Sequence, residues 1–182
     1  MLVSALCGSF RSGSFNQALL DTAVERGATH GLDIRQAAIA NFPLFCADQE
    51  SDPPPEVCAA KELIGSSEGL LLVSPEHNYG VPGVLKNAID WLSRPATDPT
   101  LRERPMAVMG ASSGYMGTVR AQLAWRQMWH YFGQSVFSEA EMFLPFAAKA
   151  IEDGRVTDAV ALERLDLYIE RLAAWLEGLS CG

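Results

Sequence analysis

Short apolar runs alternate with amphipathic segments along this chain. Five runs have the length and punctuation of strands, at residues 2–7, 32–40, 69–74, 105–109 and within 134–143. Segments with apolar residues three and four positions apart follow them, from 15 to 27 or 31, and at 56–66, 84–92, 118–132 and 162–179. Such alternation predicts an α/β fold, a parallel sheet with helices on both faces. Ligands of such sheets bind beyond the carboxyl ends of the strands.

Length and composition point to one compact domain. The chain has 182 residues, of which 48% are hydrophobic and 20% charged. No repeat, low-complexity segment or linker interrupts it, so we expect a single domain spanning residues 1–182. The net charge of −8 argues against nucleic acid or an anionic membrane surface as a partner.

The cysteines give no sign of a metal site. Cys7, Cys46, Cys58 and Cys181 form no C-x-x-C pair, and the three histidines are scattered. We therefore expect free or buried thiols in a reducing cytosol, and no bound metal. Strand-like sequence begins at Leu2 without a basic leader, and no uncharged apolar stretch approaches the roughly 18 to 20 residues needed to cross a bilayer. These features predict a cytoplasmic protein that does not contact the membrane.

The first turn, at residues 8–16, is rich in glycine and hydroxyl groups and leads from a strand into a helix. The free N–H groups and partial positive charge of a helix N-terminus stabilise an anion. Ser9, Ser14 and Asn16 add neutral donors, and the fork of Arg11 suits a phosphate. The turn contains neither G-x-x-x-x-G-K-[ST] nor G-x-G-x-x-G, so it suits a single phosphate monoester. An ordinary helix cap with a surface arginine is the alternative.

Two further turns follow strands, and we expect all three to converge on one crevice. Residues 74–83 include an amide, an aromatic and two glycines, so backbone can approach a flat ligand on which Tyr79 could pack. Residues 110–117 hold three glycines and two serines, which permit N–H groups to come close to a ring edge. A tight turn with Tyr79 in the core, and a plain flexible connection, are the alternatives.

Two motifs carry a resemblance to a known family. The segments G-S-F-R-x-G-S-F-N at 8–16 and P-E-H-N-Y-G-V-P-G-V-L-K-N-A-I-D-W-L-S-R at 75–94 resemble the NADPH-dependent FMN reductase family. This flavodoxin-like group includes bacterial quinone and chromate reductases. The resemblance covers essentially the whole chain and weakens after about residue 140. It implies a flavodoxin-like three-layer sandwich with a five-stranded parallel sheet in the order 2-1-3-4-5.

The resemblance also implies which residues bind the cofactor. The first turn would hold the FMN phosphate, the second would lie along the isoalloxazine ring, and the third would lie at its pyrimidine edge. These residues are Ser9, Arg11, Ser14, Phe15 and Asn16, then Pro75, Glu76, His77, Asn78, Tyr79 and Gly80, and finally Ser112, Ser113 and Gly114. Backbone N–H groups of residues 110–114 would stabilise the negative charge that grows on the reduced ring.

The chain departs from the family pattern at two places. The family usually has tyrosine at the position of His77, and smaller residues at those of Tyr115 and Met116. A His77 side chain that reached the site would alter substrate preference, whereas a backbone contact alone would change little. Tyr115 or Met116 would narrow the space over the flavin.

The implied activity is that of an FMN-dependent oxidoreductase. Hydride would pass from NADPH or NADH through FMN to a quinone, a flavin or another acceptor such as chromate. Spacing assembles no catalytic dyad, so we assign no acid, base or nucleophile. The alternatives are a flavodoxin-like electron carrier, with which the acidity agrees, and a phosphate-ester hydrolase, which lacks an activated nucleophile.

The family is commonly dimeric or tetrameric, so the resemblance implies a homodimer or homotetramer. Trp91, Trp125 and Trp129 lie in two predicted helices and supply more aromatic bulk than a single core face needs. They would lie either at a subunit interface or in the core.

Overall fold

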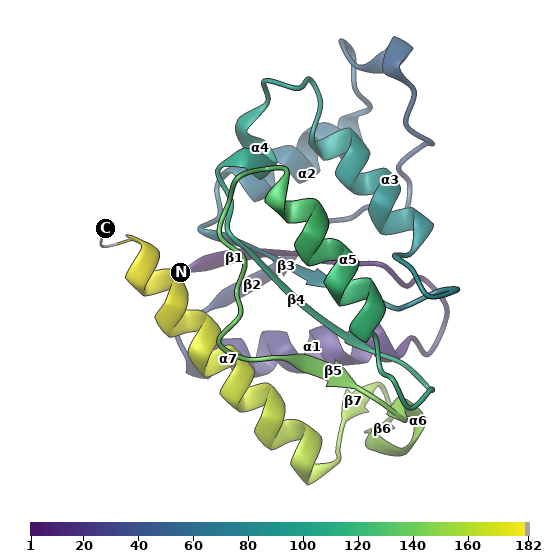
Figure 1. Cartoon of the computed structure of the whole chain (residues 1–182), viewed down its shortest axis with the longest axis vertical. Helices are drawn as coiled ribbons and strands as arrows, with labels where there is room; N and C mark the ends of the chain where they lie inside the picture. The colour runs from purple at the N-terminus through teal and green to yellow at the C-terminus, as the bar shows by residue number, and fades with distance from the viewer. Residues whose placement is uncertain (181–182) are drawn as a thin grey trace.

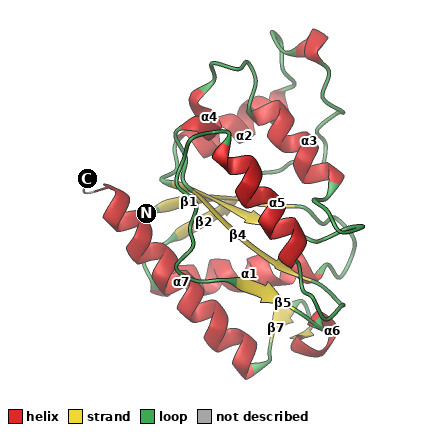
Figure 2. Ribbon diagram, viewed as in Figure 1, coloured by secondary structure: helices red, strands yellow, loops and turns green. Residues whose placement is uncertain are grey.

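The computed structural model describes residues 1–180. A five-stranded parallel sheet forms its central layer, in the order β2-β1-β3-β4-β5 (Figures 1 and 2). The strands are β1 (Leu2–Cys7), β2 (Asp33–Gln36), β3 (Gly69–Val73), β4 (Met106–Ala111) and β5 (Met142–Leu144). The predicted class and strand order are thereby confirmed.

Helices cover both faces of the sheet (Figure 1). The long helices α1 (Phe15–Thr29) and α7 (Ala159–Ser180) share a core with one face. The helices α2 (Pro55–Gly65), α3 (Gly83–Leu92) and α5 (Val119–His130) share a core with the other. Short elements fill the connections, namely η1 (Ala47–Gln49), α4 (Pro99–Arg102), α6 (Ala147–Ala150), β6 (Ile151–Glu152) and β7 (Arg155–Val156).

The central strands are apolar throughout because each of their faces meets a helical layer. Leu71 and Val73 of β3 point to the α1–α7 side, whereas Leu70 and Leu72 point to the α2–α3–α5 side. All five residues of β3 are buried. This explains why the β3 sequence is a continuous apolar run rather than an alternating one.

Three of the four tryptophans, those of α3 and α5, belong to the core. Trp91, Trp125 and Trp129 are at most 1% exposed. Their indole N–H groups donate to Pro43 O, Ser74 Oγ and Arg104 O, respectively. An indole buried with its N–H satisfied is a packing residue, so these side chains give no support to a subunit interface.

The structure differs from the sequence prediction at strand ends. Strand β5 occupies only Met142–Leu144, and the preceding segment touches the sheet through one bridge, between Val136 and Met106. Edge strand β2 is shorter than predicted, with three of its four residues exposed, since it has one neighbour to pair with. Strand β4 continues through Gly110 to Ala111.

Gly110 lies in β4 at a point where neighbouring segments leave no room for a side chain. A Cβ at Gly110 would lie 2.2 Å from Ser74 O and 2.5 Å from Thr118 Oγ1. Only glycine admits this approach, which brings the end of β3 and the start of α5 against β4. The segments that follow these strands are thereby held close together. None of the helices described within residues 1–180 is long and apolar enough to span a bilayer.

Candidate functional site

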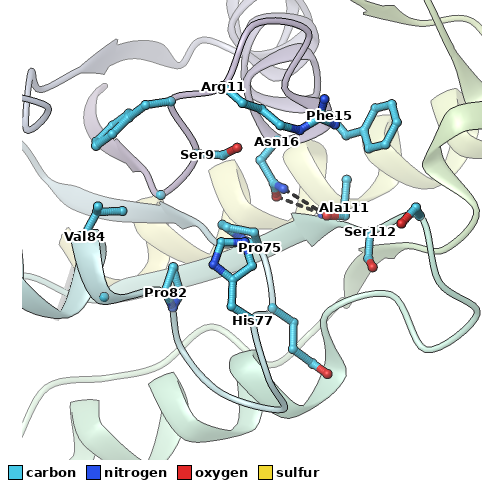
Figure 3. A pocket seen from close by; sticks show the side chains of 15 residues that line it. Ser9, Arg11, Phe15, Asn16, Pro75, His77, Pro82, Val84, Ala111 and Ser112 are labelled. Carbon is cyan, nitrogen blue, oxygen red and sulfur yellow. Dashed lines mark hydrogen bonds between the residues drawn. The ribbon is translucent and has the colours of Figure 1, made fainter.

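A pocket of about 470 Å³ lies beyond the carboxyl ends of β1, β3 and β4 (Figure 3). Segments that follow these three strands form its walls, as the topology of a parallel sheet requires. The lining residues are Gly8, Ser9, Phe10, Arg11, Phe15, Asn16, Pro75, Glu76, His77, Pro82, Gly83, Val84, Ala111, Ser112 and Ser113. The expected convergence of the three turns is confirmed.

The first turn presents free backbone donors. Gly8 N donates to Val73 O at 2.9 Å, which continues the β1–β3 pairing to the start of the turn. Within residues 1–180, the main-chain N–H groups of residues 9–16 donate to no protein acceptor. Ser14 caps α1 by accepting a hydrogen bond from Gln17 N at 3.1 Å. A row of such N–H groups at a helix start suits an anion.

Arg11 adds the only full positive charge of this turn. Its guanidinium carbon lies 4.6 Å from the centroid of the Phe15 ring, and both residues line the pocket. Figure 3 shows the Arg11 side chain extended towards Phe15. Stacking on an aromatic ring orients the guanidinium. Its Nη1 donates to Ser12 O at 3.5 Å within the same turn, and its other N–H groups are available to a ligand.

Asn16 joins two walls of the pocket. Its Nδ2 donates to Ala111 O, and Ala111 N donates to its Oδ1, each at 2.9 Å (Figure 3). The side chain is buried and ties the first turn of α1 to the end of β4. Sequence reasoning assigned this amide to the phosphate, whereas the structure places it on Ala111.

The second turn is a tight reversal between His77 and Gly80. His77 N donates to Gly80 O at 3.1 Å, and Gly80 N donates to His77 O at 2.9 Å. Asn78 and Tyr79 between them have φ values of 50° and 66°. Tyr79 is 72% exposed and does not line the pocket, so it fills neither the core nor the site. The His77 side chain does line the pocket (Figure 3).

Glu76 turns its carboxylate to α5. Its Oε2 accepts hydrogen bonds from Arg120 N at 2.9 Å and from Ala121 N at 3.1 Å, and its Oε1 lies 3.3 Å from Arg120 Nη1. A carboxylate at a helix N-terminus satisfies free N–H groups and interacts favourably with the helix dipole. Glu76 therefore anchors the second turn to α5.

Most backbone N–H groups of the third turn donate to acceptors within the protein. Ala111 N is bonded to Asn16, Ser112 N donates to Leu144 O at 3.0 Å, and Gly114 N donates to Ser112 Oγ at 3.2 Å. Within the described chain, Ser113 N has no protein acceptor. We expected the backbone N–H groups of all of residues 110–114 to be available to a ligand. Among residues 111–114, three of these groups have protein acceptors or lie within the turn's own bonds, and Ser113 N is the one that is available.

The pocket contains nine of the predicted site residues, Ser9, Arg11, Phe15, Asn16, Pro75, Glu76, His77, Ser112 and Ser113. Ser14, Asn78, Tyr79, Gly80 and Gly114 lie in the same turns but do not line it. The prediction omitted Gly8, Phe10, Pro82, Gly83, Val84 and Ala111, of which the first five fall inside the two quoted motifs. Tyr115 is exposed outside the lining, so it does not narrow the pocket.

The titratable groups near the pocket include no activated nucleophile. Cys7 is buried at the end of β1, with its Sγ 3.9 Å from Ser9 O. Burial raises the pKa of this thiol to about 11, so it stays protonated at neutral pH. Among the described residues, no group of three or more His, Cys, Asp or Glu side chains is arranged to hold a metal ion.

Comparison with known proteins assigns the chain to a family. The family model for NADPH-dependent FMN reductase matches residues 1–149. An NAD(P)H-dependent FMN reductase of Pseudomonas aeruginosa is 37% identical over 179 residues, which cover 97% of this chain and 96% of the relative. A quinone reductase of Escherichia coli is 36% identical over 168 residues, with 90% and 88% covered.

Solved structures agree with this assignment. The flavoenzyme NAD(P)H:(acceptor) oxidoreductase of Paracoccus denitrificans superposes with a TM-score of 0.90 at 29% identity, and 97% of each chain is covered. A flavodoxin of Pseudomonas aeruginosa, at 16% identity and a TM-score of 0.60, shares the fold, covering 97% of this chain and 99% of its own. The chain therefore belongs to the NADPH-dependent FMN reductase family.

Proposed function

We propose that the pocket holds FMN and that the protein passes a hydride from NADPH or NADH to a quinone or another small oxidised acceptor. The observation that carries the proposal is the shared pocket of a free N–H row at residues 9–16 and two further turns at 75–77 and 111–113. The first suits a phosphate, and the other two leave room for a flat ring. Bound FMN supplies the hydride chemistry itself.

The residues of the chain would bind and orient the cofactor. The N–H groups of the turn at residues 9–16, the hydroxyl group of Ser9 and the guanidinium of Arg11 would hold the phosphate, while Ser14 would contribute as the cap of α1. Buried Pro75 and Ala111 would provide rigid walls for the ring. Ser113 N would donate to the pyrimidine edge and stabilise negative charge there.

The position of His77 bears on the choice of acceptor. Its side chain lines the pocket, so an imidazole stands where the family usually has a phenol. We infer that this difference changes acceptor preference among quinones, flavins and chromate. The names of the relatives, FMN reductase and quinone reductase, support quinones and flavin as the first acceptors to assay.

A flavodoxin-like electron carrier remains the second candidate, since flavodoxins share this fold. The two candidates differ in nicotinamide turnover. An enzyme oxidises NADPH in the presence of a quinone faster than free FMN does, whereas a carrier does not.

The test joins a spectrum to an assay. We expect the purified protein to be yellow, to release FMN on denaturation, and to oxidise NADPH with 1,4-benzoquinone well above the rate of free FMN. A colourless protein that FMN cannot reconstitute would reject the cofactor. A yellow protein without turnover would reject the enzyme and leave the carrier.

We also propose a single domain spanning residues 1–182, a cytoplasmic location and a homodimeric or homotetrameric state. Cys7, Cys46 and Cys58 are free thiols, which suits a reducing compartment. Cys181 lies outside the described residues. The proposed oligomeric state is the one that the resemblance to the family implies.

A further inference from the structure

The second turn holds a backbone conformation that needs an explanation. With positive φ at Asn78 and Tyr79 and reciprocal hydrogen bonds between His77 and Gly80, it has the features of a type I′ reversal. Glycine is the preferred residue at the second central position, where this chain has Tyr79. A bulky residue persists there only when its surroundings hold it in place.

Arg120 supplies that hold. Its guanidinium carbon lies 4.0 Å from the centroid of the Tyr79 ring, and its Nη1 lies 3.3 Å from Glu76 Oε1. Arg120 thus contacts the turn on both sides of His77, at Glu76 before it and at Tyr79 after it. The side chains of Arg120 and Glu76 are 34% and 11% exposed, which places the ion pair in partial shelter from solvent.

A second contact ties the base of the same segment to α5. Trp125 Nε1 donates to Ser74 Oγ at 2.9 Å, and Ser74 Oγ donates to Pro75 O at 2.9 Å. This buried contact fixes Ser74 and Pro75 without help from Arg120. Glu76 also accepts hydrogen bonds from the backbone N–H groups of residues 120 and 121. The part of the turn that depends on the Arg120 side chain is therefore the outer part, residues 77–80, which includes the pocket-lining His77.

We propose that Arg120 is a positioning residue for the substrate side of the pocket. With Glu76 and Tyr79 it holds the outer part of the turn so that His77 forms the pocket wall. The phosphate side is built by residues 9–16 and receives no contact from Arg120 among the described interactions. Loss of Arg120 should therefore weaken substrate binding more than FMN binding, since the N–H groups of residues 9–16 and the walls at Pro75 and Ala111 do not depend on it. This inference rests on the flavin pocket proposed above.

The test is Arg120→Ala, measured by steady-state kinetics at saturating NADPH. We expect the KM for 1,4-benzoquinone to rise about 5-fold, with kcat within about twofold, because a loosened wall removes binding shared by ground state and transition state. The FMN dissociation constant should stay within about twofold of wild type. The N–H groups of residues 120 and 121 still reach Glu76, so the Tm should fall by no more than about 4 °C.

Partner variants separate positioning from general destabilisation. Tyr79→Phe keeps the ring under the guanidinium and should have the KM of wild type. Tyr79→Ala should raise the KM as much as Arg120→Ala does. The double variant Arg120→Ala with Tyr79→Ala should add no further increase, since the two side chains act through one contact. Arg155→Ala is the matched control, because Arg155 pairs with Asp21 and Glu25 and does not line the pocket.

Several results would overturn the proposal. One is a KM for Arg120→Ala within about twofold of wild type, and another is a parallel rise in the FMN dissociation constant. Effects of Arg120→Ala and Tyr79→Ala that multiply would also reject a shared contact. If Arg120→Ala does not fold, an unchanged KM in Tyr79→Ala decides against the proposal. Absence of turnover in the wild-type protein would instead reject the function itself.

Discussion

Among the residues of the candidate site, several side chains form hydrogen bonds to other parts of the protein. Ser14 caps α1, Asn16 holds Ala111, and Glu76 binds the start of α5. These bonds place backbone N–H groups and the remaining side chains around the pocket. Arg11 and His77 are the lining residues whose ionisable heads are not committed in this way to another element. They are therefore the residues at which substitution should act on ligands most directly.

Replacing Arg11 by alanine should weaken retention of FMN more than it changes hydride transfer. The substitution removes a cation with fork geometry from the phosphate end of the pocket, while the N–H row of residues 9–16 remains. We expect the FMN dissociation constant to rise about 10-fold, and turnover at saturating FMN to stay within about threefold of wild type. Fluorescence titration of apoprotein with FMN measures the first quantity. An unchanged dissociation constant would remove Arg11 from the phosphate site.

The buried thiol of Cys7 should make stability fall in alkaline solution. Burial raises the pKa of Cys7 from 9.0 to about 11, so between these values the unfolded chain binds fewer protons than the folded one. The free energy of unfolding therefore decreases as pH rises through this window. Wild type should lose about 2 kcal/mol more than Cys7→Ala between pH 8 and pH 10.5. Urea unfolding at the two pH values measures the difference, and equal losses would contradict the assignment.

At the scale of elements, the site depends on how closely β3, β4 and α5 approach one another. Gly110 permits that approach, because a Cβ there would collide with Ser74 O and Thr118 Oγ1. The same region contains the Trp125–Ser74 bond and the Glu76 cap of α5. The second and third turns are thus built on one crowded junction, so a change in the junction should move both walls of the pocket.

Gly110→Ala tests this junction. We expect a loss of about 3 kcal/mol or more in the free energy of unfolding, because the nearest obstacle is backbone and has little room to yield. Gly65→Ala is the control, since a Cβ at this α2 position meets no atom of another segment within 4 Å and alanine is the better helix former. Chemical unfolding compares the two. A Gly110→Ala protein as stable as wild type would show that the junction is not tight.

At the scale of the whole molecule, two cores lie on either side of one sheet. The face towards α1 and α7 packs side chains such as Leu19 and Leu172, and the opposite face packs Trp125 and Trp129. Trp91 of α3 is buried as well. Because these indoles are inside, any subunit contact must use other residues. Leu123 of α5 and the adjoining Tyr131 are 61% and 67% exposed, and both are candidates.

The oligomeric state can be measured directly. We expect size-exclusion chromatography with light scattering to give two or four times the chain mass of 19.8 kDa at micromolar concentration. Exposed apolar side chains on α5 would become buried in such an assembly. A mass of one chain at that concentration would reject the expectation.

The class of fold and the region of the site can be predicted from local patterns in the sequence. Continuous apolar runs such as residues 69–73 identify strands that meet a helical layer on each face, and punctuation by glycine and serine marks the turns after them. Parallel strands end at one edge, so three turns could be expected to share a crevice. The order of apolar and turn-forming residues is sufficient for these conclusions, because it indicates which segments are buried and where the chain turns.

The role of each side chain in those turns depends on contacts between segments that are far apart in the sequence. Asn16 bonds Ala111, and Glu76 bonds Arg120, across separations of 95 and 44 residues. No local pattern encodes such partners, since they depend on the distance between segments after the sheet has formed. The same reason explains the burial of the tryptophans, the extension of β4 through Gly110 and the shortness of β5. The position of the pocket could be predicted from the sequence, whereas the roles of the residues around it depend on how distant segments pack together.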